Sequence, residues 1–135
     1  MKRSPLKAKK PLRRKSNKPT KTLRARAVKA FNDWIKARDK YKCVTCGKQM
    51  QKGDINCNAG HFIHGNSVDF DERNMNCQCG RPCNKDLHGN AVPYTIFMMN
   101  KYGMETIHEL YRLKRIPRKF AKQELEEIIN KYKGE

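Results

Sequence analysis

Cys43-Val-Thr-Cys46-Gly47 and Cys79-Gly-Arg-Pro-Cys83-Asn84 place two pairs of closely spaced cysteines in this 135-residue chain. Four thiolates close a tetrahedral zinc site that has no open position, so the two pairs predict a structural metal. The first spacing is typical of zinc knuckles, and the second is one residue longer than usual. Because apolar residues make up only 37% of this small chain, we expect Zn²⁺ bound by Cys43, Cys46, Cys79 and Cys83 to stabilise it.

The compartment favours zinc over disulfides. No apolar stretch approaches the roughly 18 residues of a membrane span, and residues 1–15 lack the apolar segment of a secretory signal. We therefore expect a cytoplasmic protein without a membrane partner, in which thiols stay reduced. Of the two remaining cysteines, Cys77 competes with Cys79 for one ligand place. Otherwise Cys57 and Cys77 are expected to be small buried hydrophobic residues.

The net charge of +18 is distributed unevenly. Residues 1–42 hold seventeen Lys and Arg against two acidic residues, residues 43–110 hold six against seven, and residues 111–135 hold eight against four. Basic flanks around a nearly neutral centre are typical of a module held on a polyanion, since each neutralised phosphate releases a counterion. A solubilising basic tail is the alternative, and charge does not choose between DNA and RNA.

The chain divides into three parts. Residues 1–20 have almost nothing to bury, which predicts a disordered basic DNA-binding arm. Residues 21–114 are expected to form an N-terminal helix, the zinc-stapled core and the helices that follow it, and residues 115–135 a C-terminal amphipathic helix. Periodicity predicts helices at 22–40, 94–102, 106–114 and from 121 onward, with a strand leading into a loop over 59–65 and a second strand at 74–78. The fold class is therefore α+β.

The interval between the cysteine pairs holds more than a linker. His61 follows Gly60, Asn74 precedes the second pair, and Asn84 directly follows it. This His…Asn…Asn series resembles the HNH, or ββα-metal, nucleases. The resemblance implies a zinc-stapled ββα-metal (HNH) core flanked by N- and C-terminal helices. It implies that His61 is the base that activates water, that Asn74 holds the loop and orients that base, and that Asn84 starts the next helix and binds Mg²⁺ or Mn²⁺.

One position departs from the HNH pattern. Many HNH proteins, including the endonuclease VII junction resolvases that the cysteine-asparagine pattern resembles, have Asp before the catalytic His, whereas this chain has Gly60. Another residue must then supply the metal ligand. His88 is the leading candidate because it would lie one helical turn after Asn84. Weaker candidates are Asp54, His64, Asp71 and Glu72. A surface position explains His64 and His88, and a solvated charge explains the three acids, at least as well as metal binding does.

A closer resemblance covers most of the chain, from the basic arm and first helix onward. It rests on these stretches: Arg38-Asp39, Cys43-Val-Thr-Cys46-Gly47, Ala59-Gly60-His61-Phe62, Phe70-Asp71-Glu72-Arg73-Asn74-Met75-Asn76-Cys77-Gln78-Cys79, Cys83-Asn84, Gly89-Asn90, Tyr94 and Tyr102-Gly103. In these the sequence resembles the NinG/Rap phage recombination family. The Gly before the His and the Gly-Asn after the second cysteine pair are features of that family.

The family resemblance implies a structure-selective, metal-dependent DNA endonuclease that acts on branched recombination intermediates such as D-loops and Holliday junctions. A homodimer would suit symmetric cutting of a junction. Two alternatives remain: a non-catalytic zinc-dependent nucleic-acid-binding protein in which His61 is only packed, and an HNH nuclease that reads sequence. The basic arm does not separate them, because phosphate contacts carry no sequence information.

Overall fold

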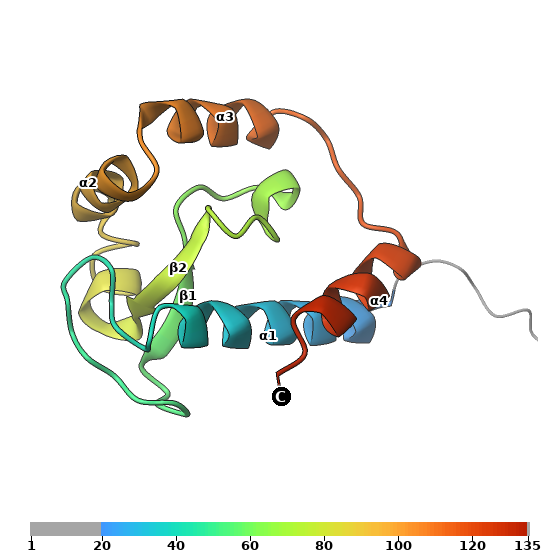
Figure 1. Ribbon diagram of the computed structural model, residues 1–135, viewed down its shortest axis with the longest axis horizontal. Helices are drawn as coiled ribbons and strands as arrows, with labels where there is room; N and C mark the ends of the chain where they lie inside the picture. The colour runs from blue at the N-terminus through green and yellow to red at the C-terminus, as the bar shows by residue number, and fades with distance from the viewer. Residues whose placement is uncertain (1–19, 135) are drawn as a thin grey trace, which may run out of the picture.

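The computed structural model describes residues 20–134, which form a mixed α+β fold (Figure 1). Four helices surround one two-stranded sheet, with short helical turns before and after its second strand. The elements in chain order are α1 (Lys21–Arg38), β1 (Cys57–His61), η1 (Asn66–Val68), β2 (Met75–Cys79), η2 (Gly80–Asn84), α2 (Ala91–Lys101), α3 (Met104–Lys114) and α4 (Lys122–Lys131). The predicted arm lies almost wholly outside the described residues.

Helix α1 forms where periodicity predicted it. Ala27, Phe31 and Ile35 recur at helical spacing and are fully buried. The helix begins after Thr20, whose Oγ1 accepts a hydrogen bond from the Leu23 amide at 3.1 Å. It ends at Arg38, earlier than the expected residue 40, because Lys40 and the next residue adopt left-handed backbone angles with positive φ.

Strands β1 and β2 pair antiparallel, with Cys57 opposite Cys79 and His61 opposite Met75. The first strand starts and ends earlier than the predicted 59–65, and the second lies within one residue of its prediction. Side chains alternate between the two faces. One face, which includes Met75, packs on α1, and the other, which includes Asn76, faces α2. The hairpin therefore lies between these two helices (Figure 1).

The C-terminal helix shares a core with α1. Leu125 on α4 is buried against Leu23 and Ala27, and the Tyr132 ring packs edge-on against Phe31 with centroids 4.8 Å apart. Figure 1 shows α4 beside α1, reached from α3 by an extended connection. Residues 115–134 thus close one side of the structure. Among residues 20–134, every helix is too short or too polar to cross a membrane.

Candidate metal centre and histidine site

The structure brings the four predicted zinc ligands together. The sulfur atoms of Cys43, Cys46, Cys79 and Cys83 all lie within 4.8 Å of one another. A tetrahedral site with Zn–S bonds of about 2.3 Å places its sulfur atoms about 3.8 Å apart. The Cys46 and Cys79 sulfur atoms are separated by 3.8 Å. The longer second spacing is therefore compatible with closure, and the cluster could hold a structural metal such as zinc.

The electrostatics of the cluster also call for a cation. Burial raises the pKa of the Cys79 thiol to about 12. Burial opposes ionisation of Cys43 as well, but hydrogen bonds from the Thr45 side chain and from the backbone of Cys79, Cys46 and Thr45 outweigh it and lower the pKa of Cys43 to about 6. Four adjacent thiolates would repel one another without a bound divalent ion. The cluster therefore has the donor set and the charge requirement of a structural zinc site.

Cys57 and Cys77 lie outside the cluster. Their sulfur atoms are 3.5 Å apart in the core beneath the hairpin, and both side chains are buried. Burial raises the pKa of Cys77 far above its usual range, which keeps this thiol neutral. Cys79, not Cys77, occupies the shared ligand place, and the remaining pair packs as the small hydrophobic residues that we predicted.

His61 is the last residue of β1 and its side chain is 31% exposed. Its Nε2 lies 3.3 Å from Asp69 Oδ1, and the other oxygen of that carboxylate accepts a hydrogen bond from Arg24 on α1 at 2.8 Å. The ring also stacks on His64, with centroids 5.2 Å apart. An imidazole held by a carboxylate and open to solvent is the arrangement that a general base needs.

Asn74 holds the loop that follows His61. Its Oδ1 accepts a hydrogen bond from the Ile63 amide, and its Nδ2 donates to the carbonyl oxygens of Ile63 and Val68, at distances of 2.9 to 3.1 Å. The side chain is fully buried, so these bonds satisfy polar atoms that water does not reach. Asn74 contacts the loop backbone, whereas the contact to the imidazole comes from Asp69.

Sequence reasoning missed Asp69. The residue lies in the loop between the strands together with Asp71 and Glu72, and nothing in the sequence separates these three acids. In the structure each acid has a different partner. Asp71 pairs with Arg73 at 2.8 Å, and Glu72 accepts a hydrogen bond from Tyr132 at 2.7 Å. Asp54 accepts from the Asn56 amide in a distant turn. Asp69 is the loop carboxylate that reaches His61.

The expected helix after the second cysteine pair is wrong in its position. Asn84 ends the short turn η2, residues 85–90 form turns, and the regular helix α2 begins only at Ala91. His88 is exposed and has a left-handed φ of 49°, which no α-helix contains. His88 therefore does not lie one helical turn from Asn84. The helical spacing that made His88 the leading candidate for a metal ligand is absent from the structure.

Gly60 lies against a polar atom that sequence reasoning also missed. A Cβ added at Gly60 would fall 2.3 Å from Gln78 Oε1. This oxygen is buried and has no hydrogen-bond partner. Leaving such an acceptor without a hydrogen bond costs about 1–3 kcal/mol of folding free energy. Packing alone does not explain an acceptor left in this state.

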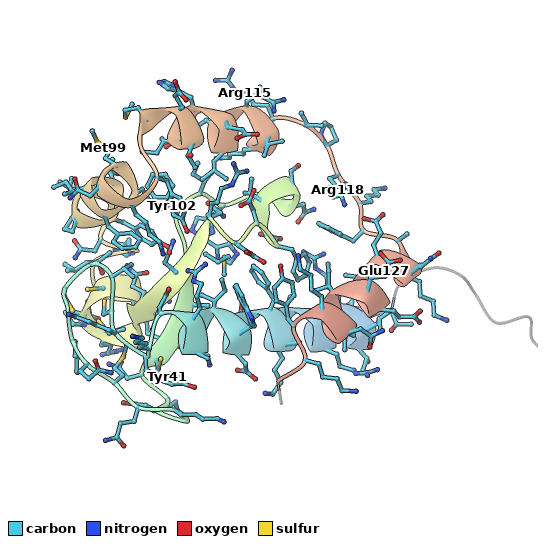
Figure 2. All side chains as sticks on the ribbon, in the orientation of Figure 1. Tyr41, Met99, Tyr102, Arg115, Arg118 and Glu127 are labelled. Carbon is cyan, nitrogen blue, oxygen red and sulfur yellow. The ribbon has the colours of Figure 1, made fainter. Side chains whose placement is uncertain are left out.

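Basic side chains and a pocket lie beside the His61 loop. Lys114 on α3 contacts the loop at Gly65, and Arg115 and Arg118 follow along the edge that leads to α4 (Figure 2).

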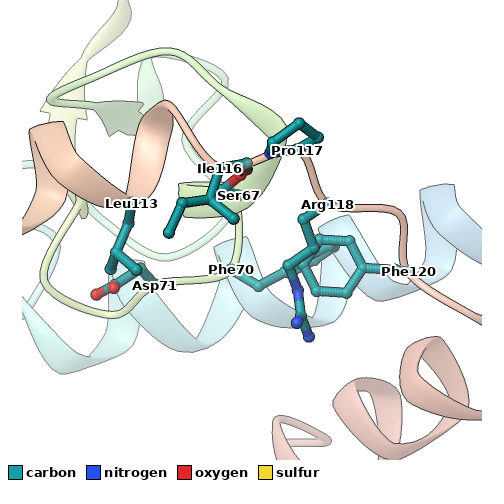
Figure 3. Close-up of a pocket in the computed structure, with 8 residues that line it drawn as sticks. All are labelled: Ser67, Phe70, Asp71, Leu113, Ile116, Pro117, Arg118 and Phe120. Atoms are coloured by element: carbon teal, nitrogen blue, oxygen red, sulfur yellow. Dashed lines mark hydrogen bonds between the residues drawn. The ribbon is translucent and has the colours of Figure 1, made fainter.

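The pocket has a volume of about 350 Å³ and lies between η1 and the connection from α3 to α4. Figure 3 shows Ser67, Ile116 and Pro117 on one side of it, with Phe70, Phe120 and Arg118 on the other.

Comparison with known proteins places the chain in a family. A family model described as "Bacteriophage Lambda NinG protein" matches residues 2–135. This chain belongs to the NinG family. It is 32% identical over 103 residues to "Protein ninG" of Escherichia phage 933W, which covers 73% of this chain and 49% of that protein. It is 31% identical over 103 residues to "Protein ninG" of Escherichia phage lambda, which covers 73% of this chain and 48% of that protein.

The chain thus spans about half the length of the curated NinG relatives that it matches. No solved structure matches it. The match to the NinG family model confirms the resemblance to that family that the sequence motifs predicted.

The motif residues quoted for the NinG resemblance include many that tie the elements together. Arg38 donates to the Met75 carbonyl at 2.8 Å, and Asp39 accepts a hydrogen bond from the Cys77 amide at 2.7 Å, so the end of α1 is fastened to β2. The Tyr94 hydroxyl donates to the Gly60 carbonyl at 2.7 Å. The side-chain Nδ2 of Asn90 donates to the Cys83 sulfur at 3.6 Å. These contacts hold the hairpin between the cysteine cluster and the helices.

Proposed function

We propose that this NinG-family protein is a metal-dependent DNA endonuclease of the HNH type that hydrolyses phosphodiester bonds in branched DNA. The observation that carries the proposal is His61 at the end of β1, contacted by Asp69 and followed by a loop that Asn74 holds in place. A structural metal in the cysteine cluster would stabilise the other end of the same hairpin.

In this proposal His61 accepts a proton from the attacking water. Asp69 holds the imidazole through Nε2, which leaves the other ring nitrogen to act on water. Arg24 holds the Asp69 carboxylate in place through an ion pair at 2.8 Å. Asn74 limits movement of the loop backbone and so fixes the direction of approach.

Mg²⁺ or Mn²⁺ would stabilise the charge that develops on the phosphate oxygens. The amide oxygens of Asn84 and Gln78 are donors of the kind that these hard cations accept. The Gln78 oxygen has no hydrogen-bond partner, so it retains its full acceptor capacity for a cation.

The charge distribution supports a nucleic acid as the partner, and the NinG resemblance makes DNA the expected one. The surface next to His61 carries Arg24 and Lys114, and α3 ends in the basic residues Arg112 and Lys114. The seventeen basic residues within positions 1–42 add a further source of phosphate contacts. Preference for branched over linear DNA is carried by the NinG resemblance. If junctions are cut symmetrically, the active species should be a homodimer.

One observation favours a second candidate, a non-catalytic zinc-dependent nucleic-acid-binding protein. Within residues 20–134, the four cysteines are the only group of three or more His, Cys, Asp or Glu side chains close enough to share a metal ion. A catalytic ion at the His61 site would therefore depend on amide oxygens and on the substrate phosphate. The binding-protein candidate predicts tight DNA binding with no cleavage.

The deciding experiment is a cleavage panel with the full-length zinc-loaded protein. A four-way junction, a D-loop and a linear duplex of equal length would be incubated with Mg²⁺, Mn²⁺ or EDTA. We expect metal-dependent cleavage of the branched substrates only. Cleavage of duplexes at particular sequences would support the sequence-reading HNH alternative, and binding without cleavage would support the binding protein.

His61→Ala tests the base within the same panel. A general base contributes about 10²- to 10⁴-fold to the rate, so the variant should lose that much cleavage. It should keep zinc and bind junctions as before. His108→Ala, which changes an exposed histidine on α3, is the matched control and should cleave normally. Wild-type cleavage by His61→Ala would disprove the HNH proposal.

Asn84→Ala separates the metal ligand from the base. Removing a ligand weakens ion binding, so its cleavage should fall and then recover in part at higher Mn²⁺ concentration. His61→Ala should not recover, because added metal does not replace a proton acceptor. Identical metal dependence of the two variants would rule out the separate roles.

A further inference from the structure

Gln78 carries the only buried side-chain polar atom within residues 20–134 that lacks a hydrogen-bond partner. Its Nε2 donates to the Gly89 carbonyl at 2.7 Å and to Thr45 Oγ1 at 3.2 Å. Because a backbone carbonyl only accepts hydrogen bonds, the amide nitrogen must face Gly89. The orientation of the amide is thereby fixed, and Oε1 is directed at Gly60.

The position of this oxygen matches the missing carboxylate. A Cβ at residue 60 would lie 2.3 Å from Gln78 Oε1. That separation is close to the distance between the Cβ of an aspartate and its own carboxylate oxygens. Many HNH proteins have Asp at the position of Gly60. Gln78, which lies on the same face of the hairpin, therefore presents an oxygen near where the side-chain oxygen of that Asp would lie.

Asn84 lies close to the same place through one shared residue. The Gly89 amide donates to the Asn84 carbonyl at 3.2 Å, while the Gly89 carbonyl accepts from Gln78. Asn84 and Gly89 are both partly exposed, whereas Gln78 is fully buried. Gly89 therefore links the Gln78 side chain to the backbone of Asn84.

We infer that Gln78 Oε1 replaces the usual aspartate as a protein ligand of the catalytic divalent ion, together with Asn84. The inference rests on the proposed function for the use of that ion, but ion binding itself is separately measurable. Amide oxygens suit Mg²⁺ and Mn²⁺. A neutral amide attracts a cation less than a carboxylate does, so affinity should be modest and should increase when DNA phosphate completes the coordination.

The first test uses the wild-type protein and needs no substitution. Mg²⁺ would be titrated into ¹⁵N-labelled zinc-loaded protein while the side-chain NH₂ signals of Gln78 and Asn84 and the Gly60 amide are followed by NMR. We expect saturable shifts of these signals, larger than those of the Gln49 side chain, which bonds the Lys40 carbonyl on the far side of the first cysteine pair. Saturable Mg²⁺ binding that leaves Gln78 unshifted would overturn the inference.

The second test moves the oxygen from one strand to the other. Gln78→Met keeps the side-chain length and should weaken Mn²⁺ binding, measured by calorimetry, by at least about 10-fold. Gly60→Asp with Gln78→Ala should restore binding, since the double variant returns a carboxylate to the space that Gln78 vacates. Gln123→Met is the control: it makes the same change at an exposed amide on α4 and should bind Mn²⁺ as the wild type does.

The outcomes separate this inference from the proposed function. Unchanged Mn²⁺ affinity in Gln78→Met with full zinc content, while the wild type still cleaves junctions, would reject Gln78 as a ligand and leave the endonuclease proposal standing. Weakened Mn²⁺ binding in Gln78→Met with no cleavage by any form would support the ion site and reject the nuclease. If Gln78→Met does not fold, the wild-type NMR titration decides.

Discussion

Asp69 and His61 form a contact that joins the loop between the strands to the end of β1. The carboxylate lies 3.3 Å from His61 Nε2 and is held from the other side by Arg24 at 2.8 Å. Asp69 therefore links His61 to Arg24 on α1, which is distant from both residues in sequence. In the proposed nuclease, Asp69 is a positioning residue that acts through His61.

Asp69→Asn should lower kcat for junction cleavage by about 10- to 100-fold, because a misdirected base loses the geometry of proton transfer. KM and the melting temperature should change little, since the site is partly exposed. Steady-state kinetics would separate the two parameters. Asp33→Asn is the control, as Asp33 pairs with Lys29 and Lys36 on the outer surface of α1. A kcat within twofold of the wild type would show that Asp69 does not position the base.

Cys43→Ser or Cys83→Ser should abolish zinc binding and collapse the fold, because metal-binding energy is folding energy in such sites. Zinc content and thermal unfolding would measure both effects. Cys57→Ala is the matched control: it removes a buried thiol outside the cluster and should retain about one zinc per chain. An unchanged melting temperature after complete zinc removal would contradict a structural role.

Deleting residues 1–19 should weaken DNA binding and flatten its dependence on salt, since the segment is basic and contains no acid. The deletion retains Thr20, which caps α1, so helix stability is preserved. Thr20→Ala in the full chain measures the cap separately, at about 1 kcal/mol of unfolding free energy. A truncated protein with the full-length salt slope would show that the arm does not contact phosphate.

Leu125→Ala should destabilise the whole chain by about 2–5 kcal/mol, because it opens a cavity between α4 and α1. Denaturant unfolding should remain a single transition. Ile96→Ala, at a side chain that is 54% exposed on α2, should have little effect. The opposite result would be unfolding of the C-terminal helix alone, with the denaturant midpoint of the rest of the chain unchanged. That result would show that residues 115–135 form a separate folding unit.

Features that depend on local spacing could be predicted from the amino-acid sequence. The spacing within each cysteine pair is a local property that is typical of zinc ligands. The four zinc ligands could therefore be chosen before the fold was known. Helical periodicity located α1, and the strand predicted at 74–78 lies within one residue of β2. The order His61, Asn74, Asn84 and the surrounding motifs also carried the NinG resemblance, which the family comparison confirmed.

Contacts between side chains that are distant in sequence could be learned only from the packing of the helices and strands. Asp69, Asp71 and Glu72 are equivalent in sequence, and each is assigned a different partner by the packing of α1, α3 and the C-terminal end of the chain. His88 fitted a helical spacing that the turns after η2 do not have. The Gln78 oxygen reaches Gly60 because the strands pair in one register, and register is a long-range property that local spacing does not specify.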